Sequence, residues 1–377
     1  MLYGILIVEK RDNMRIVLAA GGTGGHVFPA ISLGEYIRDE MNGEILFIGV
    51  NGKMEAQEVP KHNIPFMGVE ARGFVGSITN RMKCLQQVEV NIRLIKKKLK
   101  EFKPDIVMGF GGYVSVPVLI AAKQLNIPIM IHEQNSVAGL ANKMLGKISD
   151  GNIICFKHAE SFFPKSKVRF LGSPRASSLA KRKKDDSILK ELNIQTKLPL
   201  GLIVMGSLGS ESVNAHMVGI LKHFSEYPLM ELIYVTGKNH YEEMKKECGE
   251  LNSHIHIVPF IDQERILPHL DFMVCRAGAT TIAELCAIGV PSIIIPSPYV
   301  AHNHQVLNAS ELARNDACIM IEEKDLTRDE MIGKMLALSS DNKLKKKLHD
   351  NALLFGKINA CEEIYEYIEE IIKNKNG

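Results

Sequence analysis

The chain has 377 residues, of which 46% are hydrophobic and 24% are charged, so it has the composition of a globular protein large enough for two domains. A formal net charge of +3, the absence of Trp and an aromatic content of 6% argue against a nucleic-acid partner. The seven cysteines form no CxxC pair, which argues against a disulfide framework and fits a cytoplasmic protein, and no apolar run is long enough to cross a bilayer.

The first half begins with a buried strand and a glycine-rich loop. Arg15–Ala20 is a continuous apolar run, GGTGGH follows from Gly21 to His26, and a helix comes next with Pro29 near its start. Four glycines form a nest for an anion and let a bulky ligand approach the backbone. The loop matches neither GxGxxG with a following ribose-binding acid nor GxxxxGK[ST], which disfavours a nicotinamide dehydrogenase and a P-loop kinase. His26 has either a structural role or that of a general base.

Polar and glycine-rich turns follow two of the later strands. Gly111, Gly112 and Tyr113 come after one strand, and Glu133 and Asn135 come after the next. Because the carboxyl ends of parallel strands share one edge, we expect these turns and the GGTGGH loop to form a binding rim. Ordinary turn chemistry also explains each loop taken alone. The further strands of this half are predicted at Ile45–Ile48, Pro65–Val69, Asp105–Gly109, Ile127–Ile131, Asn152–Phe156 and Val168–Leu171.

A basic helix is predicted from Arg81 to Lys103, with eight Lys or Arg residues and two Glu. It is either a solvated helix that covers the sheet or a partly apolar basic patch that contacts an anionic membrane surface.

After a junction near residues 172–178, the pattern of strand, small-residue loop and helix begins again at Leu200–Met205. We therefore predict an α/β protein with two Rossmann-like domains facing across a cleft. The domains are placed at residues 14–173 and 174–359, and the last helix, within 360–377, returns to the first domain. The other strands of the second sheet are predicted at Leu232–Val235, His256–Phe260, Phe272–Cys275, Ser292–Ile295 and Ala317–Ile321.

The segment Asp271–Gln305 is the most informative part of the second half. A strand leads through small residues into a helix that Thr280 or Thr281 is expected to cap, with Glu284 in its first turn. The helix N-terminus suits a phosphate, and a carboxylate one turn further suits the hydroxyls of a ribose. The alternative is a capped helix packed between two strands.

No metal or cofactor is predicted. His254-x-His256 and His302-x-His304 have no third ligand at a suitable spacing, and the chain contains no Asp-x-Asp. A nucleotide-sugar transferase that depends on a divalent ion is therefore disfavoured. A diphosphate leaving group would have to be stabilised by helix N-termini and backbone amides.

Together the motifs resemble the MurG family of glycosyltransferases from about Met14 to the end of the chain. The matching segments are GGTGGHVFPA, GFGGYVSVPVLIAA, IHEQNSVAGLANK, MGSLGS, CRAGATTIAELCAIGVPSIIIPSP and HNHQVLNA. The resemblance implies a GT-B-type fold and inverting, metal-independent transfer of N-acetylglucosamine from UDP-N-acetylglucosamine. The implied acceptor is the 4-hydroxyl of undecaprenyl-pyrophosphoryl-N-acetylmuramyl-pentapeptide, in cell-wall peptidoglycan synthesis. It further implies a peripheral protein on the cytoplasmic face of the plasma membrane.

The resemblance also implies site residues, with acceptor contacts from Gly111, Gly112 and Tyr113. The linker Gly172–Arg175 is one residue shorter before its Arg than the family's GNPVR. The implied donor contacts are Thr23, Gly24, Gly25, Asn135, Arg175, Ser207, Ile261, Ala279, Thr280, Thr281, Ile282, Ala283, Glu284 and Gln305.

His26 is the first candidate for the catalytic base, and Glu133 is the second. Two other functions fit the same loops. A UDP-N-acetylglucosamine 2-epimerase would act on the donor alone and need no lipid, and a non-catalytic nucleotide-sugar-binding subunit would bind UDP without turnover.

Overall fold

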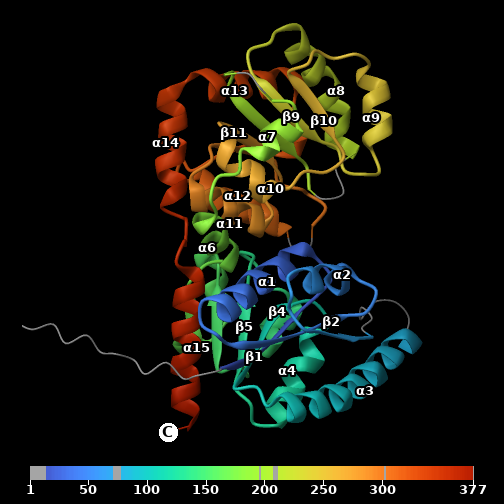
Figure 1. The fold of residues 1–377 in the computed structure, drawn as a ribbon, viewed down its shortest axis with the longest axis vertical. Helices are drawn as coiled ribbons and strands as arrows, with labels where there is room; N and C mark the ends of the chain where they lie inside the picture. The colour runs from blue at the N-terminus through green and yellow to red at the C-terminus, as the bar shows by residue number, and fades with distance from the viewer. Residues whose placement is uncertain (1–13, 71–77, 195–196, 207–210, 301–302, 377) are drawn as a thin grey trace, which may run out of the picture.

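The computed structural model describes residues 14–70, 78–194, 197–206, 211–300 and 303–376, and they form two α/β domains, each built on one parallel sheet (Figure 1). The predicted fold class is confirmed. The boundary between residues 173 and 174 stays a prediction, because helix α6 (Pro174–Lys181) contacts α1 and α15 on one side and α11 on the other.

The first sheet has seven strands in the order β3-β2-β1-β4-β5-β6-β7. Its strands are β1 Arg15–Ala20, β2 Glu44–Val50, β3 Phe66–Val69, β4 Ile106–Gly111, β5 Ile129–Glu133, β6 Gly151–Ile154 and β7 Val168–Phe170. The helices of this half are α1 Gly24–Asp39, α2 Met54–Lys61, α3 Ile78–Phe102, α4 Ser115–Gln124, α5 Leu140–Leu145, and the short 3-10 turns Lys157–Phe162 and Lys165–Lys167.

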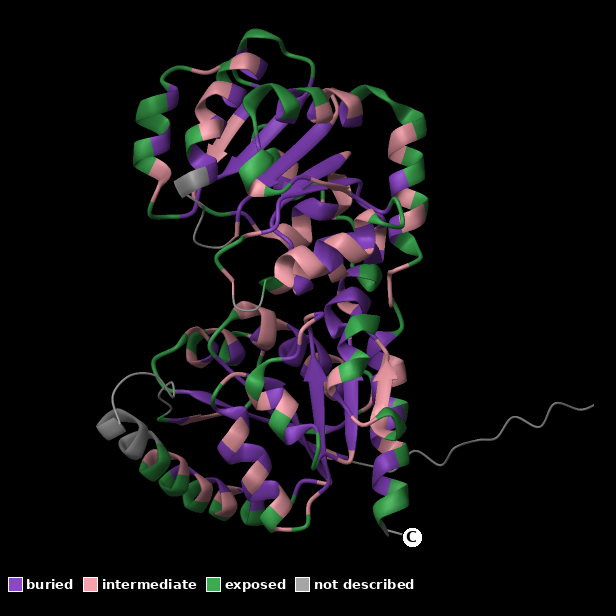
Figure 2. Cartoon of the chain, turned by 180° about the vertical axis from the view of Figure 1, so that it is seen from behind, coloured by how far each residue is buried: buried purple, intermediate pink, exposed green. Residues whose placement is uncertain are grey.

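Helices cover both faces of this sheet, which explains why its central strands β1 and β4 are almost entirely apolar (Figure 2). Ile16 and Leu18 of β1 belong to the core shared with α1 and with α15 (Ala360–Asn376). Val17 and Ala19, on the other face, belong to the core shared with α3 and α4. The last helix, α15, therefore packs in the core of the first sheet.

The second sheet has six strands in the order β10-β9-β8-β11-β12-β13. Its strands are β8 Leu200–Val204, β9 Glu231–Val235, β10 Ile255–Val258, β11 Phe272–Cys275, β12 Ser292–Ile294 and β13 Ile319–Met320. The helices are α7 Ser187–Glu191, α8 Glu211–Glu226, α9 Tyr241–Cys248, α10 Gln263–Ile266, α11 Ala279–Ile288, α12 His304–Ala313, α13 Arg328–Ser340 and α14 Asn342–Leu353, with 3-10 turns at Leu267–His269 and Glu323–Asp325.

In both sheets the strand order reverses between the first and the fourth strand of the sheet. β1 lies beside β4 in the first sheet, and β8 lies beside β11 in the second. Ligands of doubly wound sheets bind at the carboxyl ends of the strands at such a point. A ligand site is therefore expected at the loops that follow β1, β4, β8 and β11.

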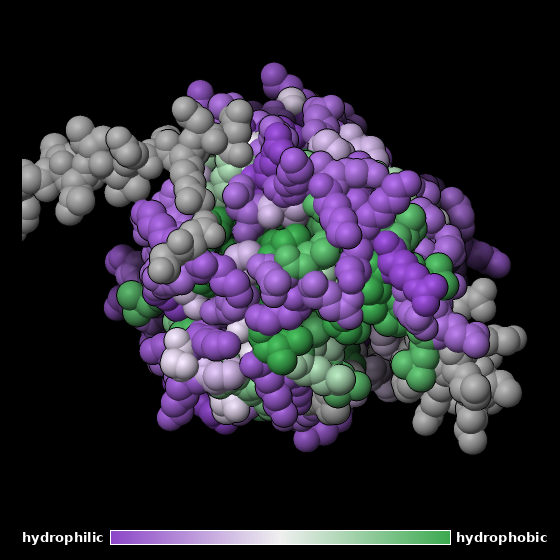
Figure 3. All heavy atoms as spheres, turned by 90° about the horizontal axis from the view of Figure 1, so that it is seen from below, coloured by the Kyte–Doolittle hydropathy of each residue, from purple (hydrophilic) through white to green (hydrophobic). Residues whose placement is uncertain are grey.

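Helix α3 covers the sheet, as one of the two predictions for the basic segment has it, and also exposes apolar side chains; contact with a membrane stays a prediction. Ile95 and Leu99 are fully buried against the sheet, whereas Leu85, Val90 and Leu94 are 48–59% exposed. Figure 3 shows hydrophobic side chains gathered among hydrophilic ones on the underside of the molecule. In the described part of the chain, no helix combines the length and hydropathy that crossing a bilayer requires.

A histidine–carboxylate pair on the first domain makes a pH-dependent contribution to stability. His62 Nδ1 lies 2.7 Å from Glu35 Oε1, and this hydrogen bond raises the pKa of His62. A raised histidine pKa stabilises the fold below the unfolded-state pKa of about 6.5, and the gain is lost as pH rises through the higher folded-state value. Because both side chains are partly exposed, we expect less than about 1 kcal/mol.

The measurement is the free energy of unfolding of wild type and Glu35→Gln at several pH values between about 5.5 and 8.5. The wild type should be the more stable protein at the acidic end, and the two should converge at the alkaline end. A difference that stays constant or grows with pH would contradict the assignment.

Candidate functional site

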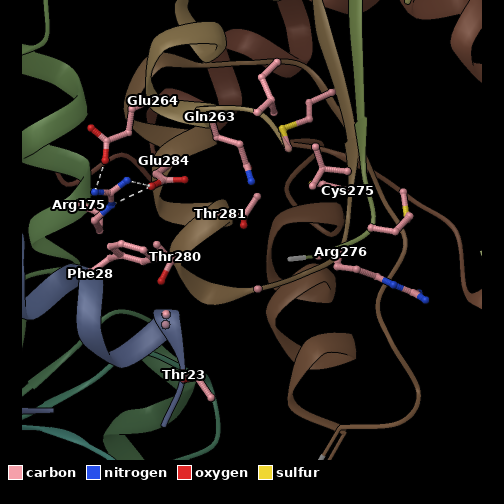
Figure 4. Close-up of a pocket in the computed structure, with 18 of the residues that line it drawn as sticks. Thr23, Phe28, Arg175, Gln263, Glu264, Cys275, Arg276, Thr280, Thr281 and Glu284 are labelled. Carbon is pink, nitrogen blue, oxygen red and sulfur yellow. Dashed lines mark hydrogen bonds and ion pairs between the residues drawn. The ribbon is translucent and has the colours of Figure 1, made fainter. Parts of the chain in front are cut away.

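A cleft of about 1090 Å³ lies between the two domains and is lined by both (Figure 4). Of the residues predicted to contact a donor, nine line it: Thr23, Gly24, Gly25, Arg175, Ile261, Thr280, Thr281, Glu284 and Gln305. Ser207 lies outside the described residues, as does His302.

The N-termini of α1 and α11 meet in this cleft. A Cβ placed on Gly25 would lie 3.7 Å from Thr23 Oγ1 and 3.9 Å from Thr280 Oγ1, so the first turns of the two helices are neighbours. Neither first turn contains an acidic residue. Two sets of unpaired backbone N–H groups and two positive dipole ends therefore converge, an arrangement that suits a diphosphate.

Three predictions about these helix starts are wrong. The helix after β1 begins at Gly24, so Gly24, Gly25 and His26 form its first turn instead of a loop. The N-cap of α11 is Gly278, and neither threonine caps it; Thr280 Oγ1 is buried without a hydrogen-bond partner. Because Gly278 adopts the extended N-cap conformation, the helix starts at Ala279 and Glu284 falls in its second turn.

Only one face of α11 reaches the cleft. The side chains of Thr280, Thr281 and Glu284 line it. Ala279 and Ile282 belong to the buried core of the second domain, and Ala283 lines a separate cavity of about 30 Å³. Between residues 279 and 284, some side chains therefore face the cleft and others face the core, as the helical period requires.

Arg175 lies between two carboxylates at the edge of the cleft (Figure 4). Its Nε and Nη2 donate to Glu284 Oε1 at 2.8 and 2.5 Å, and its Nη1 pairs with Glu264, which also pairs with Arg182. The guanidinium carbon is 5.5 Å from the centre of the Phe28 ring on α1. Arg175 thus joins α6, α10 and α11 of one side to α1 of the other.

Burial and charge act differently on the two carboxylates. Burial raises the pKa of Glu284, although Arg175 opposes the shift. Burial also disfavours ionised Glu264, but Arg175 and Arg182 outweigh it and lower the pKa of Glu264. Both bonds from Arg175 to Glu284 end on Oε1, which leaves Oε2 for a ligand hydroxyl.

His26 lies where the loops after β1 and β4 touch. Its Nδ1 is 3.2 Å from the carbonyl oxygen of Gly21, which the N–H tautomer at Nδ1 would satisfy, and 3.3 Å from Thr23 Oγ1. A Cβ on Gly111 would lie 2.8 Å from His26 Nε2, and one on Gly112 would collide with the carbonyl oxygen of Gly21. Both glycines have positive φ, +121° and +82°, so the close approach and the backbone both require glycine here.

The pKa of His26 is lowered. Burial is the largest cause and His304 acts in the same direction, while Glu133, the carbonyl of Gly21 and Glu55 oppose them. The imidazole is therefore neutral near pH 7, which is the form that can accept a proton.

Glu133 is the last residue of β5 and is buried, with hydrogen bonds on both oxygens. Oε1 accepts from the backbone N–H of Asn135 at 3.0 Å, and Oε2 accepts from Gly139 N–H at 3.0 Å and Asn142 Nδ2 at 2.9 Å. These hydrogen bonds from Asn135, Gly139 and Asn142 to Glu133 hold the loop that contains Asn135 in place. His26, Glu133 and Asn135 are all outside the set of residues that line the cavity, and the hydrogen bonds of Glu133 give it a structural role in its own loop.

The same loop is fastened to the second domain by Asn308. Its Oδ1 accepts from the N–H and the hydroxyl of Ser136, at 3.0 and 2.5 Å, and its Nδ2 donates to the carbonyl of Ala277 at 3.1 Å. Ser136 and Asn308 are both fully buried. The loop after β5 and the loop after β11 are thus held in register across the domain junction.

Of the remaining predicted residues, Gln305 accepts a hydrogen bond from Ser297 N–H at 2.8 Å, which leaves its amide NH₂ for the cleft. Ile261 is buried at the cleft wall, and Tyr113 is 56% exposed outside it. Sequence reasoning missed several lining residues, although Phe28 and Arg276 lie inside the matching segments: Phe28, Glu58, Phe260, Gln263, Glu264, Arg276 and Tyr299.

The first of the two histidine pairs considered as metal ligands, His254 and His256, has other partners. His254 Nε2 lies 2.8 Å from the carbonyl of Phe224, and His256 Nε2 lies 2.6 Å from Glu231 Oε1. Within the described ranges, no group of three metal-binding side chains comes together.

Family models match both halves of the chain. The glycosyltransferase family 28 N-terminal domain matches residues 16–153, and the glycosyltransferase family 28 C-terminal domain matches residues 201–365. Two curated relatives are both named UDP-N-acetylglucosamine–N-acetylmuramyl-(pentapeptide) pyrophosphoryl-undecaprenol N-acetylglucosamine transferase. The protein from Acetivibrio thermocellus is 39% identical over 96% of this chain and 99% of its own length. The protein from Halalkalibacterium halodurans is 38% identical over 96% of this chain and 100% of its own.

Solved structures agree with the fold. The crystal structure of MurG from Acinetobacter baumannii has a TM-score of 0.73 at 25% identity and covers 95% of this chain and 99% of that one. The UDP-GlcNAc 2-epimerase from Neisseria meningitidis, bound to UDP-GlcNAc, has a TM-score of 0.70 at 13% identity, covering 95% and 100%. The second likeness shows the fold alone.

Proposed function

The chain belongs to the family of UDP-N-acetylglucosamine–N-acetylmuramyl-(pentapeptide) pyrophosphoryl-undecaprenol N-acetylglucosamine transferases, and we propose that it performs this family's reaction by one inverting displacement in the interdomain cleft. It is a hexosyltransferase of peptidoglycan synthesis, with UDP-N-acetylglucosamine as donor and a lipid-linked muramyl-pentapeptide as acceptor. The observation that supports the site best is the meeting of the α1 and α11 N-termini in the cleft, with Glu284 beside them.

The donor pose follows from the charges that line the cleft. The diphosphate lies between the two helix N-termini, where backbone amides and helix dipoles absorb its charge without a metal ion. The ribose hydroxyls donate to Oε2 of Glu284, and the uracil lies against the backbone of Ile261. The amide of Gln305 binds the donor sugar, and so does Asn135, which lies in the loop that Glu133 holds in place.

The acceptor approaches from the first domain, over Gly111, Gly112 and Tyr113. His26 Nε2 takes the proton of the acceptor's 4-hydroxyl while that oxygen forms a bond to C1 of the donor sugar. The bond from C1 to the β-phosphate oxygen breaks, and its electron pair leaves with UDP. Attack opposite the leaving group inverts C1, through a transition state with oxocarbenium character.

The polyprenyl tail of the acceptor places the reaction at a membrane. We propose that the chain binds the cytoplasmic face of the plasma membrane peripherally. The exposed apolar residues of α3 and its lysines support this, since each basic residue near an anionic surface contributes about 1 kcal/mol.

A transfer assay tests the function. The protein is incubated with radiolabelled UDP-N-acetylglucosamine, with and without a prenyl-pyrophosphoryl-muramyl-pentapeptide acceptor, in the presence of a chelator. We expect labelled lipid only when the acceptor is present, and unchanged rates with the chelator. Conversion of the donor to its 2-epimer without acceptor would indicate the epimerase, and UDP binding without any product would indicate a binding subunit.

A further inference from the structure

Glu55 is a carboxylate that lies wholly inside the first domain, behind the loop after β1. It belongs to the first turn of α2 and is 0% exposed. Its Oε1 accepts from the N–H of Val50 at 3.2 Å, and its Oε2 is buried without a hydrogen-bond partner. Leaving a buried acceptor unpaired costs about 1–3 kcal/mol, so stability alone does not explain a glutamate here.

Two glycines leave the space that the Glu55 side chain fills. A Cβ on Gly21 would lie 2.5 Å from Glu55 Oε1, and a Cβ on Gly49 would lie 2.7 Å from Glu55 Cγ. Gly21 is also the residue whose carbonyl oxygen contacts His26 Nδ1 at 3.2 Å. Gly21 therefore has the Glu55 carboxylate beside its Cα and the His26 imidazole at its carbonyl oxygen.

Titratable groups face His26 from three elements. They are Glu55 on α2, Glu133 and the neutral, buried His132 on β5, and His304 on α12. The charge of Glu133 is already compensated by the N–H groups of its own loop. Both carboxylates raise the pKa of His26, Glu133 more strongly than Glu55. Glu133 has a second task in holding its own loop, whereas Oε2 of Glu55 has no hydrogen-bond partner that would explain its place.

We propose that Glu55 is a positioning residue for the transfer step. Its carboxylate fixes the peptide of Gly21, which orients the imidazole of His26, and it stabilises the positive charge that the imidazole gains with the acceptor's proton. The role is comparable to that of a buried carboxylate behind a catalytic histidine, except that a peptide unit separates the two groups. The inference depends on the proposed function, with His26 as base.

The test is Glu55→Gln, which keeps the shape and the acceptor for Val50 but removes the charge. We expect kcat to fall about 10- to 100-fold, while KM for UDP-N-acetylglucosamine stays nearly unchanged. The acidic limb of the kcat–pH profile should move to lower pH, and NMR titration of the His26 ring should show a lower pKa. Glu35→Gln is the matched control, because it removes the same charge from the same domain at the pair with His62, and it should leave both readouts at wild-type values.

The outcomes separate the inference from the function on which it depends. A wild type that transfers no sugar to the lipid acceptor overturns the function, whereas the His26 titration needs no substrate and still tests the coupling. A Glu55→Gln protein whose rate falls with its thermal stability, but whose His26 titration does not move, overturns the positioning role. If Glu55→Gln fails to fold, Glu55→Asp is the second variant, because it moves the charge away from His26 by the length of one methylene. A smaller decrease in the pKa of His26 would then support the role. An unchanged titration of His26 would overturn it.

Discussion

His26→Ala is expected to lower kcat by about 10²- to 10⁴-fold and to leave KM for UDP-N-acetylglucosamine within a factor of about three. The imidazole is neutral near pH 7 because burial lowers its pKa, and its Nδ1 is engaged by Gly21 and Thr23, so Nε2 is the nitrogen that can take a proton. The measurement is steady-state transfer of labelled sugar to the lipid acceptor, with donor affinity measured separately by calorimetry with UDP. In the wild type, kcat should fall as pH drops through the His26 pKa, and the variant should lack this limb.

Two variants show whether the loss belongs to His26 alone. His62→Ala removes another histidine of the same domain, one that pairs with Glu35, and should keep wild-type turnover. Glu133→Gln should loosen the loop from Asn135 to Asn142 and lower the thermal stability, while the pH limb assigned to His26 persists. Near-normal turnover of His26→Ala with unchanged UDP affinity, or loss of the limb only in Glu133→Gln, would move the base from His26 to Glu133.

The sheets could be predicted from the sequence because parallel strands covered on both faces are continuous apolar runs. Arg15–Ala20 and Phe272–Cys275 were located to the residue, and the two repeats of strand, small-residue loop and helix gave the two-domain architecture. Several residues of the segment Asp271–Gln305, among them Thr280, Glu284 and Gln305, line the cleft. All of these are local patterns, in which each residue's neighbours in the chain decide its environment.

The helix starts could not be predicted, because distant contacts decide them. Glycine is a poor helix former, so Gly24 and Gly25 favoured a loop. In the structure both lie in the first turn of α1, where a Cβ on Gly24 would lie 2.9 Å from the ring of Phe28 and where Gly25 approaches Thr280 of the other domain. Small residues are needed at this meeting of two helices, and that need overrides their low propensity.

The long-range ion pair and hydrogen bond beside the cleft are not encoded in any local sequence pattern. Arg175 and Glu284 are 109 positions apart, and Ser136 and Asn308 are 172 apart. Glu284 suggested a ribose contact and Arg175 a donor contact, but nothing in the sequence showed that each is the other's partner. Such pairs become visible only when the two domains are seen together.

Arg175→Ala is expected to lower the free energy of unfolding by about 3–5 kcal/mol at pH 7, the largest stability effect predicted for this chain. The substitution leaves Glu284 buried and ionised without its cation and removes one of the two cations from Glu264. Chemical denaturation followed by circular dichroism measures it. Because burial already raises the pKa of Glu284, losing Arg175 raises it further. A raised carboxylate pKa means stability that is present at low pH and lost as pH rises, so the deficit should shrink from pH 7 toward pH 5 as Glu284 takes up a proton.

Arg182→Ala is the matched control, since it also pairs with Glu264 but has a side chain that is 36% exposed, and it should cost less than about 1 kcal/mol. Adding Glu284→Gln to Arg175→Ala removes the unpaired charge, so the double variant should recover a large part of the lost stability, as a coupled pair does in a double-mutant cycle. The same Glu284→Gln change should weaken UDP binding in either background, because it alters the carboxylate that accepts the ribose hydroxyls. If the double variant were no more stable than Arg175→Ala, Arg175 would stabilise the junction by packing against Phe28 and not by neutralising Glu284.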